Sequence, residues 1–172
     1  MNTTTDSIRR ACTAQTTLTT PLGPLLIART VNGLAGAWFE GQKHHPGVFD
    51  APERADDELL RRAADQLRGY FAGERSRFAL PLDLHGTAFQ RAVWAALMAI
   101  PGGSTASYGA IARAVGSASA VRAVGGAVGR NPVSVIVPCH RVVGTDGTLT
   151  GYAGGVDRKR ALLALEHAPV AA

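Results

Sequence analysis

The stretch SYGAIARAVGSASAVRAVGGAVG, Ser107–Gly129, decides how the second half of this chain folds. Its first part predicts a short helix that Gly116 ends, with Ile111 and Val115 facing inward. Its second part predicts another short helix, which Ser119 can cap. Two short helices joined by a tight glycine-containing turn are typical of a helix-turn-helix, although any α-hairpin has the same pattern.

The second of these predicted helices carries one long side chain, Arg122, among small ones. Each interior glycine costs about 1 kcal/mol relative to alanine, so such a helix is intrinsically weak. A helix surface made of small side chains permits the close approach of another backbone. Either a neighbouring helix packs tightly against it, or the helix enters a DNA groove with Arg122 reaching between the bases. The small residues concerned are Ala120, Ala123, Gly125, Gly126 and Ala127.

A longer helix precedes this pair. Thr87 and Gln90 form a capping-box pattern, and Pro101-Gly102-Gly103 ends the helix. The apolar residues of one helical face are Phe89, Val93, Leu97 and Ile100.

On the other side, Val133–Val137 predicts a buried strand that Pro138 ends, because proline cannot donate to a sheet ladder. Cys139 follows directly. A turn at residues 145–147 and a glycine-rich loop then lead to a final helix that contains RALLALEH. Glu166 lies four residues after Leu162 in that helix and shares an apolar face, so its carboxylate needs a partner.

The first half predicts a smaller α/β unit. Leu25–Ala28 and Leu34–Phe39 are apolar runs around an Asn32-Gly33 turn, which indicates a β-hairpin. Residues 56–73 predict an amphipathic helix. An extended link broken by Pro81 places a domain boundary near residues 80–86. We therefore expect a flexible terminus over 1–15, an N-terminal α/β domain over 16–85 and a C-terminal domain over 86–172.

The composition is that of a globular protein of 172 residues, with 46% hydrophobic and 18% charged residues. Neither a membrane-spanning run nor a signal-peptide core is present, so a cytoplasmic protein without a membrane partner is expected. Residues 1–85 hold 10 Lys and Arg against 10 Asp and Glu, whereas residues 86–172 hold 8 against 3. The basic half suggests a polyanion partner such as nucleic acid, and the alternative is chance surface charge.

Cys12 and Cys139 are the cysteines of the chain, too few for a disulfide framework. Cys139 can be a core thiol, a metal ligand or a nucleophile. His140 and Arg141 are poor neighbours for an inert core thiol, and the histidines show no metal-ligand spacing. A nearby base and positive charge favour the nucleophile, although the other two remain open.

Six motifs together resemble the O6-alkylguanine-DNA alkyltransferase family. They stand in the family's order and spacing between about Thr87 and Glu166, and TPLGPLLIA is a looser echo in the first half. The motifs are PCHRVV at Pro138–Val143, Asn131-Pro132, SYGAIA at Ser107–Ala112, RAVGGA at Arg122–Ala127, GYAGG at Gly151–Gly155 and LLALE at Leu162–Glu166.

The resemblance implies a mixed α/β (α+β) fold, with a ribonuclease-H-like N-terminal domain and a winged-helix-like C-terminal catalytic domain. It implies one irreversible transfer per molecule, from O6-alkylguanine or O4-alkylthymine in duplex DNA to Cys139, without cofactor or metal. Nucleotide flipping is required, because the alkylated oxygen is out of reach inside the base stack. The expected protein is a monomer in the stand-alone repair form, and cooperative assembly on DNA stays open.

The resemblance also implies roles for particular residues. His140 would act through a water as the base for Cys139, and Glu166 would orient His140. Asn131 would brace the turn that holds the site. Tyr108 would donate a proton to the leaving base. The implied DNA contacts are Arg122, Tyr108, Ser117, Arg141 and Arg130, and the implied base pocket is Val128, Val142, Tyr152, Ala153, Gly154 and Lys159.

Three residues depart from some relatives. Ala153 stands where some carry serine, Arg130 stands where some carry glycine, and Val128 is a small wall residue.

Three other functions compete with this interpretation. A non-catalytic lesion-binding relative would lack the cysteine. A winged-helix regulator would need base-reading side chains, which the Ala-, Gly- and Val-rich helix around Arg122 does not offer. A Cys-His hydrolase would not need a basic half.

Overall fold

The N-terminal half is built on an antiparallel sheet in the order β1-β2-β3. The computed structural model describes residues 3–171. The predicted hairpin is confirmed, since β2 pairs with β3 with Leu25 opposite Phe39. The first strand was not expected from the sequence, because AQTTLTT carries a single large apolar side chain, Leu18. The strands are β1 (Ala14–Thr20), β2 (Gly23–Arg29) and β3 (Leu34–Phe39).

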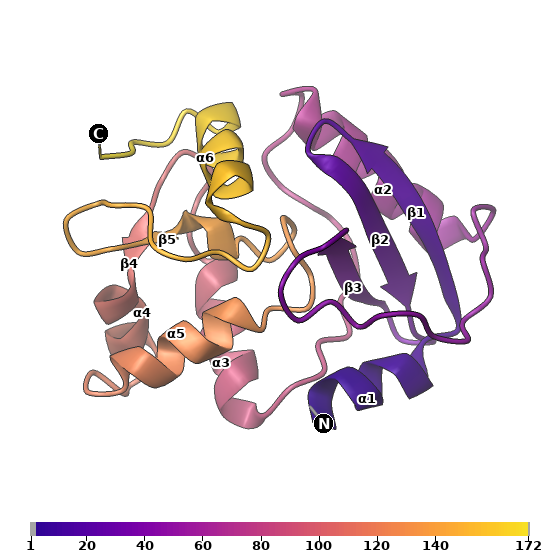
Figure 1. The fold of residues 1–172 in the computed structure, drawn as a ribbon, viewed down its shortest axis with the longest axis horizontal. Coiled ribbons are helices and arrows are strands. Elements are labelled where there is room, and N and C mark those ends of the chain that lie inside the picture. Colours follow the sequence, from indigo (N-terminus) through magenta and orange to yellow (C-terminus); the bar gives the residue numbers. More distant parts are fainter. Residues whose placement is uncertain (1–2, 172) are drawn as a thin grey trace. The chain divides into compact units, whose positions relative to one another are not determined.

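The predicted amphipathic helix is α2 (Glu58–Phe71), which packs against β1 and β2 (Figure 1). Asp57 caps it by accepting a hydrogen bond from the backbone N–H of Leu60, and Gly73 follows its end with φ 76°. The buried residues of the helix are Leu59, Leu60, Ala63, Ala64, Leu67 and Tyr70.

Residues Thr3–Ala11 form helix α1, where the sequence suggests only a flexible terminus. Ile8 anchors this helix, because its side chain is buried in an apolar cluster with Trp38 and Phe49. Residues 1 and 2 of the expected terminus lie outside the described residues. No helix in the described part of the chain is long and apolar enough to cross a membrane.

The chain divides into two units. The first comprises the described residues up to His85 together with Pro132–Ile136, and the second comprises Gly86–Asn131 and Val137 onward. The mixed α/β fold expected from the sequence is confirmed.

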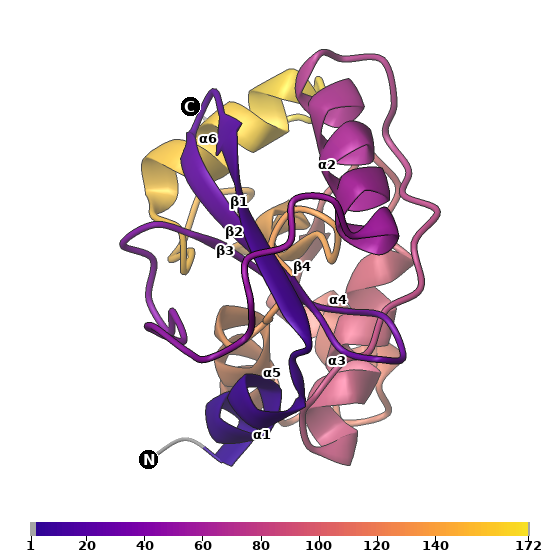
Figure 2. The ribbon, with the colours of Figure 1, turned by 90° about the vertical axis from the view of Figure 1, so that its right-hand side faces the viewer.

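The second unit contains three helices that pack on one another, α3 with α4 and both with α5 (Figures 1 and 2). The indole N–H of the buried Trp94 donates to the carbonyl of Ala127 at 2.9 Å, which ties α3 to α5. The predicted capping box of Thr87 and Gln90 is present, but Ser119 does not cap α5, whose cap is Ala120 without a side-chain bond. The helices are α3 (Ala88–Met98), α4 (Tyr108–Ala114) and α5 (Val121–Gly129).

The remaining elements follow Cys139 or flank α4. The short strands β4 (Ala106–Ser107) and β5 (Val142–Val143) pair in parallel, and α6 (Val156–Leu165) is the final helix. The predicted strand over Val133–Val137 is wrong. These residues are buried but form turns, with a single bridge from Ala37 to Val133.

The capping box on α3 gives a test of local stability. Thr87 Oγ1 accepts from the N–H of Gln90 at 3.1 Å, so Thr87→Ala should lower the free energy of unfolding by about 1 kcal/mol. Urea unfolding followed by far-ultraviolet circular dichroism measures the change. Thr87→Ser keeps a capping hydroxyl and should stay close to the parent protein, and equal stability of the Ala variant would mean that the cap contributes nothing.

Candidate active site

Cys139 begins a single 3-10 turn, η1 (Cys139–Arg141), directly after two tight γ-turns. In the first, Ile136 N–H donates to Ser134 C=O at 2.9 Å across Val135, whose φ is 72°. In the second, Cys139 N–H donates to Val137 C=O at 2.8 Å across Pro138. A γ-turn with positive φ is rare and strained, above all at a β-branched residue, so the surrounding structure must hold it in place.

Asn131 braces this segment and reaches the thiol. Its Nδ2 donates to Val137 C=O at 2.8 Å and to Cys139 Sγ at 3.1 Å. A carboxamide has two N–H donors, so one side chain can serve both acceptors. Asn131 is buried, as is Cys139, whose residue is 4% exposed.

His140 shares a buried carboxylate with Arg141. His140 Nε2 lies 2.7 Å from Glu166 Oε1, while Arg141 donates from Nε to Oε2 and from Nη2 to Oε1, both at 2.9 Å. The carboxylate that the sequence left without a partner is therefore bound by both His140 and Arg141. His140 Nδ1 has no hydrogen-bond partner among the residues that the structure describes. An Nε2–H that donates to the carboxylate leaves Nδ1 as the atom able to accept a proton.

Burial decides the protonation of this site. It lowers the pKa of His140 below its usual 6.5, against the opposing effect of Glu166. It also raises the pKa of the Cys139 thiol above its usual 9.0, against the Asn131 hydrogen bond and the charge of Lys159. Cys139 is therefore a thiol beside a neutral imidazole near neutral pH, and it needs a base at the moment of reaction.

Two predicted site residues, Arg141 and Lys159, have buried, hydrogen-bonded side chains. Arg141 was expected to contact DNA, but it is buried, its guanidinium binds Glu166, and Nη1 donates to the Ile100 carbonyl at 2.6 Å. Lys159 was expected to line the base pocket. Its amine is buried and donates to the carbonyls of Val142 at 2.5 Å, Gly151 at 3.4 Å and Thr150 at 3.5 Å. Removal from water lowers the pKa of Lys159 to about 8.

The other predicted site residues belong to the same unit. Tyr108 opens α4 and is half-buried, and its hydroxyl accepts from Thr150 Oγ1 at 3.1 Å. Val128, Val142 and Gly154 are buried, and Tyr152 and Ala153 are half-buried. No sequence motif pointed to Thr150 or to the Ile100 carbonyl.

The predicted DNA contacts outside the buried site lie toward solvent. Arg122 and Arg130, in and just after α5, are exposed, and Ser117 in the preceding turn is half-buried.

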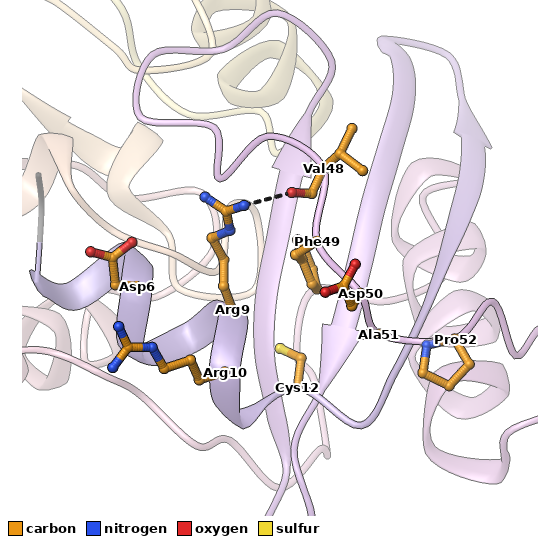
Figure 3. A pocket seen from close by; sticks show the side chains of 9 residues that line it. All are labelled: Asp6, Arg9, Arg10, Cys12, Val48, Phe49, Asp50, Ala51 and Pro52. Atoms are coloured by element: carbon orange, nitrogen blue, oxygen red, sulfur yellow. Dashed lines mark hydrogen bonds between the residues drawn. The ribbon is translucent and has the colours of Figure 1, made fainter.

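The second thiol, Cys12, lies in the N-terminal unit. It lines a pocket between α1 and residues 48–52, close to Phe49 (Figure 3). Burial and the charge of Asp83 raise the pKa of Cys12 to about 11, so it is protonated near neutral pH. The described residues hold no group of three or more His, Cys, Asp or Glu that could bind a metal ion.

The depressed pKa of His140 predicts a pH dependence of stability. Below its usual pKa of 6.5 the unfolded chain binds a proton at this imidazole that the folded chain does not, so the free energy of unfolding should fall as the pH drops from 7 toward 5. The slope from one such group is at most about 1.4 kcal/mol per pH unit. Urea unfolding at several pH values measures it.

The matched control is His140→Gln, which removes the titrating ring. The readout is the slope against pH rather than the absolute stability, because the substitution also disturbs a buried hydrogen bond. An unchanged slope in the variant would contradict the depressed pKa.

The chain is similar in sequence to known proteins over both of its halves. Residues 14–84 match the ribonuclease-like domain of 6-O-methylguanine DNA methyltransferase, and residues 88–168 match its DNA binding domain. The methylated-DNA–protein-cysteine methyltransferase of Mycobacterium bovis is 49% identical over 150 residues, which are 87% of this chain and 90% of that protein. The protein of the same name from Methanosarcina acetivorans is 48% identical over 146 residues, 85% of this chain and 93% of that protein.

A solved structure carries the same fold. Mycobacterium tuberculosis OGT in complex with DNA superposes with a TM-score of 0.82 at 47% identity, over 91% of this chain and 95% of that chain. The family resemblance seen in the sequence motifs is therefore confirmed. The chain belongs to the 6-O-methylguanine DNA methyltransferase family, and its activity is that of a methylated-DNA–protein-cysteine methyltransferase in direct-reversal DNA repair.

Proposed function

We propose that the chain transfers one alkyl group from the O6 of guanine, or the O4 of thymine, in duplex DNA to Cys139. The observation that carries this proposal is the buried Cys139 thiol, held by Asn131 and followed by the His140–Glu166 pair. The product thioether is stable, so each molecule reacts once.

The reaction begins with removal of the thiol proton. His140 Nδ1 takes this proton through a water, while Nε2 stays bonded to Glu166, which stabilises the imidazolium that forms. Asn131 Nδ2 and the charge of Lys159 stabilise the thiolate as it develops. Because the resting pKa of Cys139 is raised, the thiol stays unreactive until a substrate is in place.

Transfer is a displacement at the alkyl carbon. The Cys139 sulfur forms the new S–C bond while the C–O6 bond breaks, and the electron pair goes to the base. Tyr108 donates its phenolic proton to N3 of the departing guanine and so neutralises it. The proton that the thiol gave up returns through the site to Tyr108. In the net reaction one alkyl group moves from guanine to Cys139, and one proton moves from Cys139 to guanine.

The alkylated base must leave the duplex to reach Cys139, because an in-line approach to the carbon is blocked inside the stack. Arg122 fills the space that the base leaves, and its exposed position on α5 supports this role. Val128, Val142 and residues 152–154 receive the flipped base. Arg130, Ser117 and Tyr108 contact the DNA backbone, aided by the basic charge of residues 86–172. The relative from M. tuberculosis, solved in complex with DNA, supports DNA as the partner.

We propose that the protein works in the cytoplasm as a monomer on duplex DNA that contains O6-alkylguanine. The rival functions are not favoured. A lesion sensor would not need the thiol and its base, and a sequence-specific regulator would need base-reading side chains on α5, which offers one arginine among small residues.

The transfer is tested by replacing the acceptor. Cys139→Ser should abolish transfer but keep binding to duplex DNA that carries one O6-methylguanine, because a hydroxyl is a far weaker nucleophile than a thiolate. Intact-mass spectrometry with peptide mapping measures the gain of one methylene on the Cys139 peptide of the parent protein. Cys12→Ser is the matched control and should react normally. Clearance of the lesion by Cys139→Ser at the parent rate would refute the acceptor.

The role of Arg122 is tested on two substrates. Arg122→Ala should slow transfer from duplex DNA more than transfer from free O6-methylguanine, because a free base needs no replacement in a stack. Arg130→Ala is the control for loss of an exposed positive charge. It should weaken the affinity for duplex DNA, but at saturating DNA its transfer rates from both substrates should match those of the parent protein, so the comparison is made at saturation. Equal losses on both substrates in Arg122→Ala would exclude the space-filling role.

A further inference from the structure

Thr150 places its hydroxyl on the one polar atom of the Tyr108 side chain. Thr150 Oγ1 donates to Tyr108 Oη at 3.1 Å. Thr150 belongs to the loop between β5 and α6, whereas Tyr108 opens α4. The bond therefore joins two segments that are 42 residues apart in the sequence.

The backbone of Thr150 is held from within the unit. The buried amine of Lys159 donates to the carbonyls of Thr150 and Gly151, at 3.5 and 3.4 Å, and to that of Val142 at 2.5 Å. One ammonium group thus ties the loop to β5. An exposed threonine on an untethered loop would offer its hydroxyl only intermittently, and here the contacts of Lys159 with the carbonyls of Thr150 and Gly151 restrict the loop.

Gly125 of α5 presents no side chain to the ring of Tyr108. A Cβ built on Gly125 would lie 3.9 Å from Cδ1 of Tyr108, so the glycine leaves this edge of the ring uncovered. This neighbour therefore offers no polar group that could orient the hydroxyl proton. The hydrogen bond from Thr150 supplies that direction.

The direction of this bond matters for proton transfer. A phenol has one proton, and a phenol that spends it on a neighbouring acceptor cannot give it to a leaving base. A hydroxyl that donates to the phenol oxygen leaves this proton available. It also stabilises the negative charge that grows on the oxygen as the proton departs, since hydrogen bonds to the charged form favour that form.

We propose that Thr150 is a positioning residue for alkyl transfer: its hydroxyl donates to Tyr108 Oη, orients the phenol and leaves the phenolic proton for the departing base. This inference rests on the proposed donor role of Tyr108. Thr150 acts through Tyr108 and need not touch the substrate.

The test compares two substitutions at position 150. Thr150→Val keeps the β-branched side chain and removes the hydroxyl, whereas Thr150→Ser keeps the hydroxyl. Single-turnover transfer from duplex O6-methylguanine at saturating protein should slow between about two- and tenfold in Thr150→Val, the range for one neutral hydrogen bond. Thr150→Ser should restore the rate to within about twofold. The dissociation constant for lesion DNA should be the same in all three proteins.

A double-mutant cycle separates this role from a structural one. In a Tyr108→Phe background no phenol oxygen is left to receive the bond, so Thr150→Val should cost nothing further. An equal loss in both backgrounds, or a Thr150→Ser variant as slow as Thr150→Val, would overturn the proposal. If Tyr108→Phe itself reacts at the parent rate, the donor role of Tyr108 fails and the Thr150 proposal with it, while a methylene gain on Cys139 would still support the proposed acceptor.

Discussion

A single buried carboxylate organises the catalytic unit. The Glu166 side chain is 2% exposed, and a charge at that depth is tolerated only when it is paired and fully hydrogen-bonded. Both of its oxygens are occupied, by His140 from one side and by Arg141 from the other. Because Glu166 is also the C-cap of α6, the end of that helix is fixed against η1. The pairing therefore holds α6 against η1, the turn that begins with Cys139.

The same carboxylate explains why the site can be inert and competent at once. Arg141 keeps the negative charge of Glu166 paired, so the neutral imidazole of His140 has a stable acceptor for its Nε2 proton. Burial keeps the Cys139 thiol protonated, and the Asn131 bond to sulfur prepares for the thiolate without forming it. A protonated thiol is a poor nucleophile, so Cys139 is protected from side reactions with other electrophiles when no lesion is bound.

Much of the fold was predictable from the sequence, because local signals there agree with tertiary packing. The capping box of α3, the Asn32-Gly33 hairpin and the apolar face of α2 all formed as expected. Helix α1 and strand β1 were missed, since their polar sequences become ordered through a few anchors such as Ile8 and Leu18. The strand expected over Val133–Val137 failed because an apolar run specifies burial but not conformation, and the γ-turn at Val135 is imposed by its surroundings.

The candidate site shows the same division. Motifs predicted Cys139, His140, Asn131 and Glu166, which the structure joins by hydrogen bonds or by adjacency in the chain. The sequence could not tell a buried arginine from a surface one, so the guanidinium of Arg141 was assigned to DNA although it points inward. Thr150 could not be found at all, because its contact with Tyr108 depends on where a long loop lies. The sequence gives the charge and type of each residue, whereas the direction in which a side chain points depends on how the chain packs.

Helix α5 carries the consequence of being made from small residues. Three glycines and no side-chain cap in nine residues give a segment that would not be helical on its own in water. Its order comes from α3 and α4, above all from the Trp94 indole that holds the carbonyl of Ala127. The helical conformation of α5 therefore depends on packing against α3 and α4 rather than on its own sequence. The helix with the smallest side chains is thus also the one whose order comes from its neighbours.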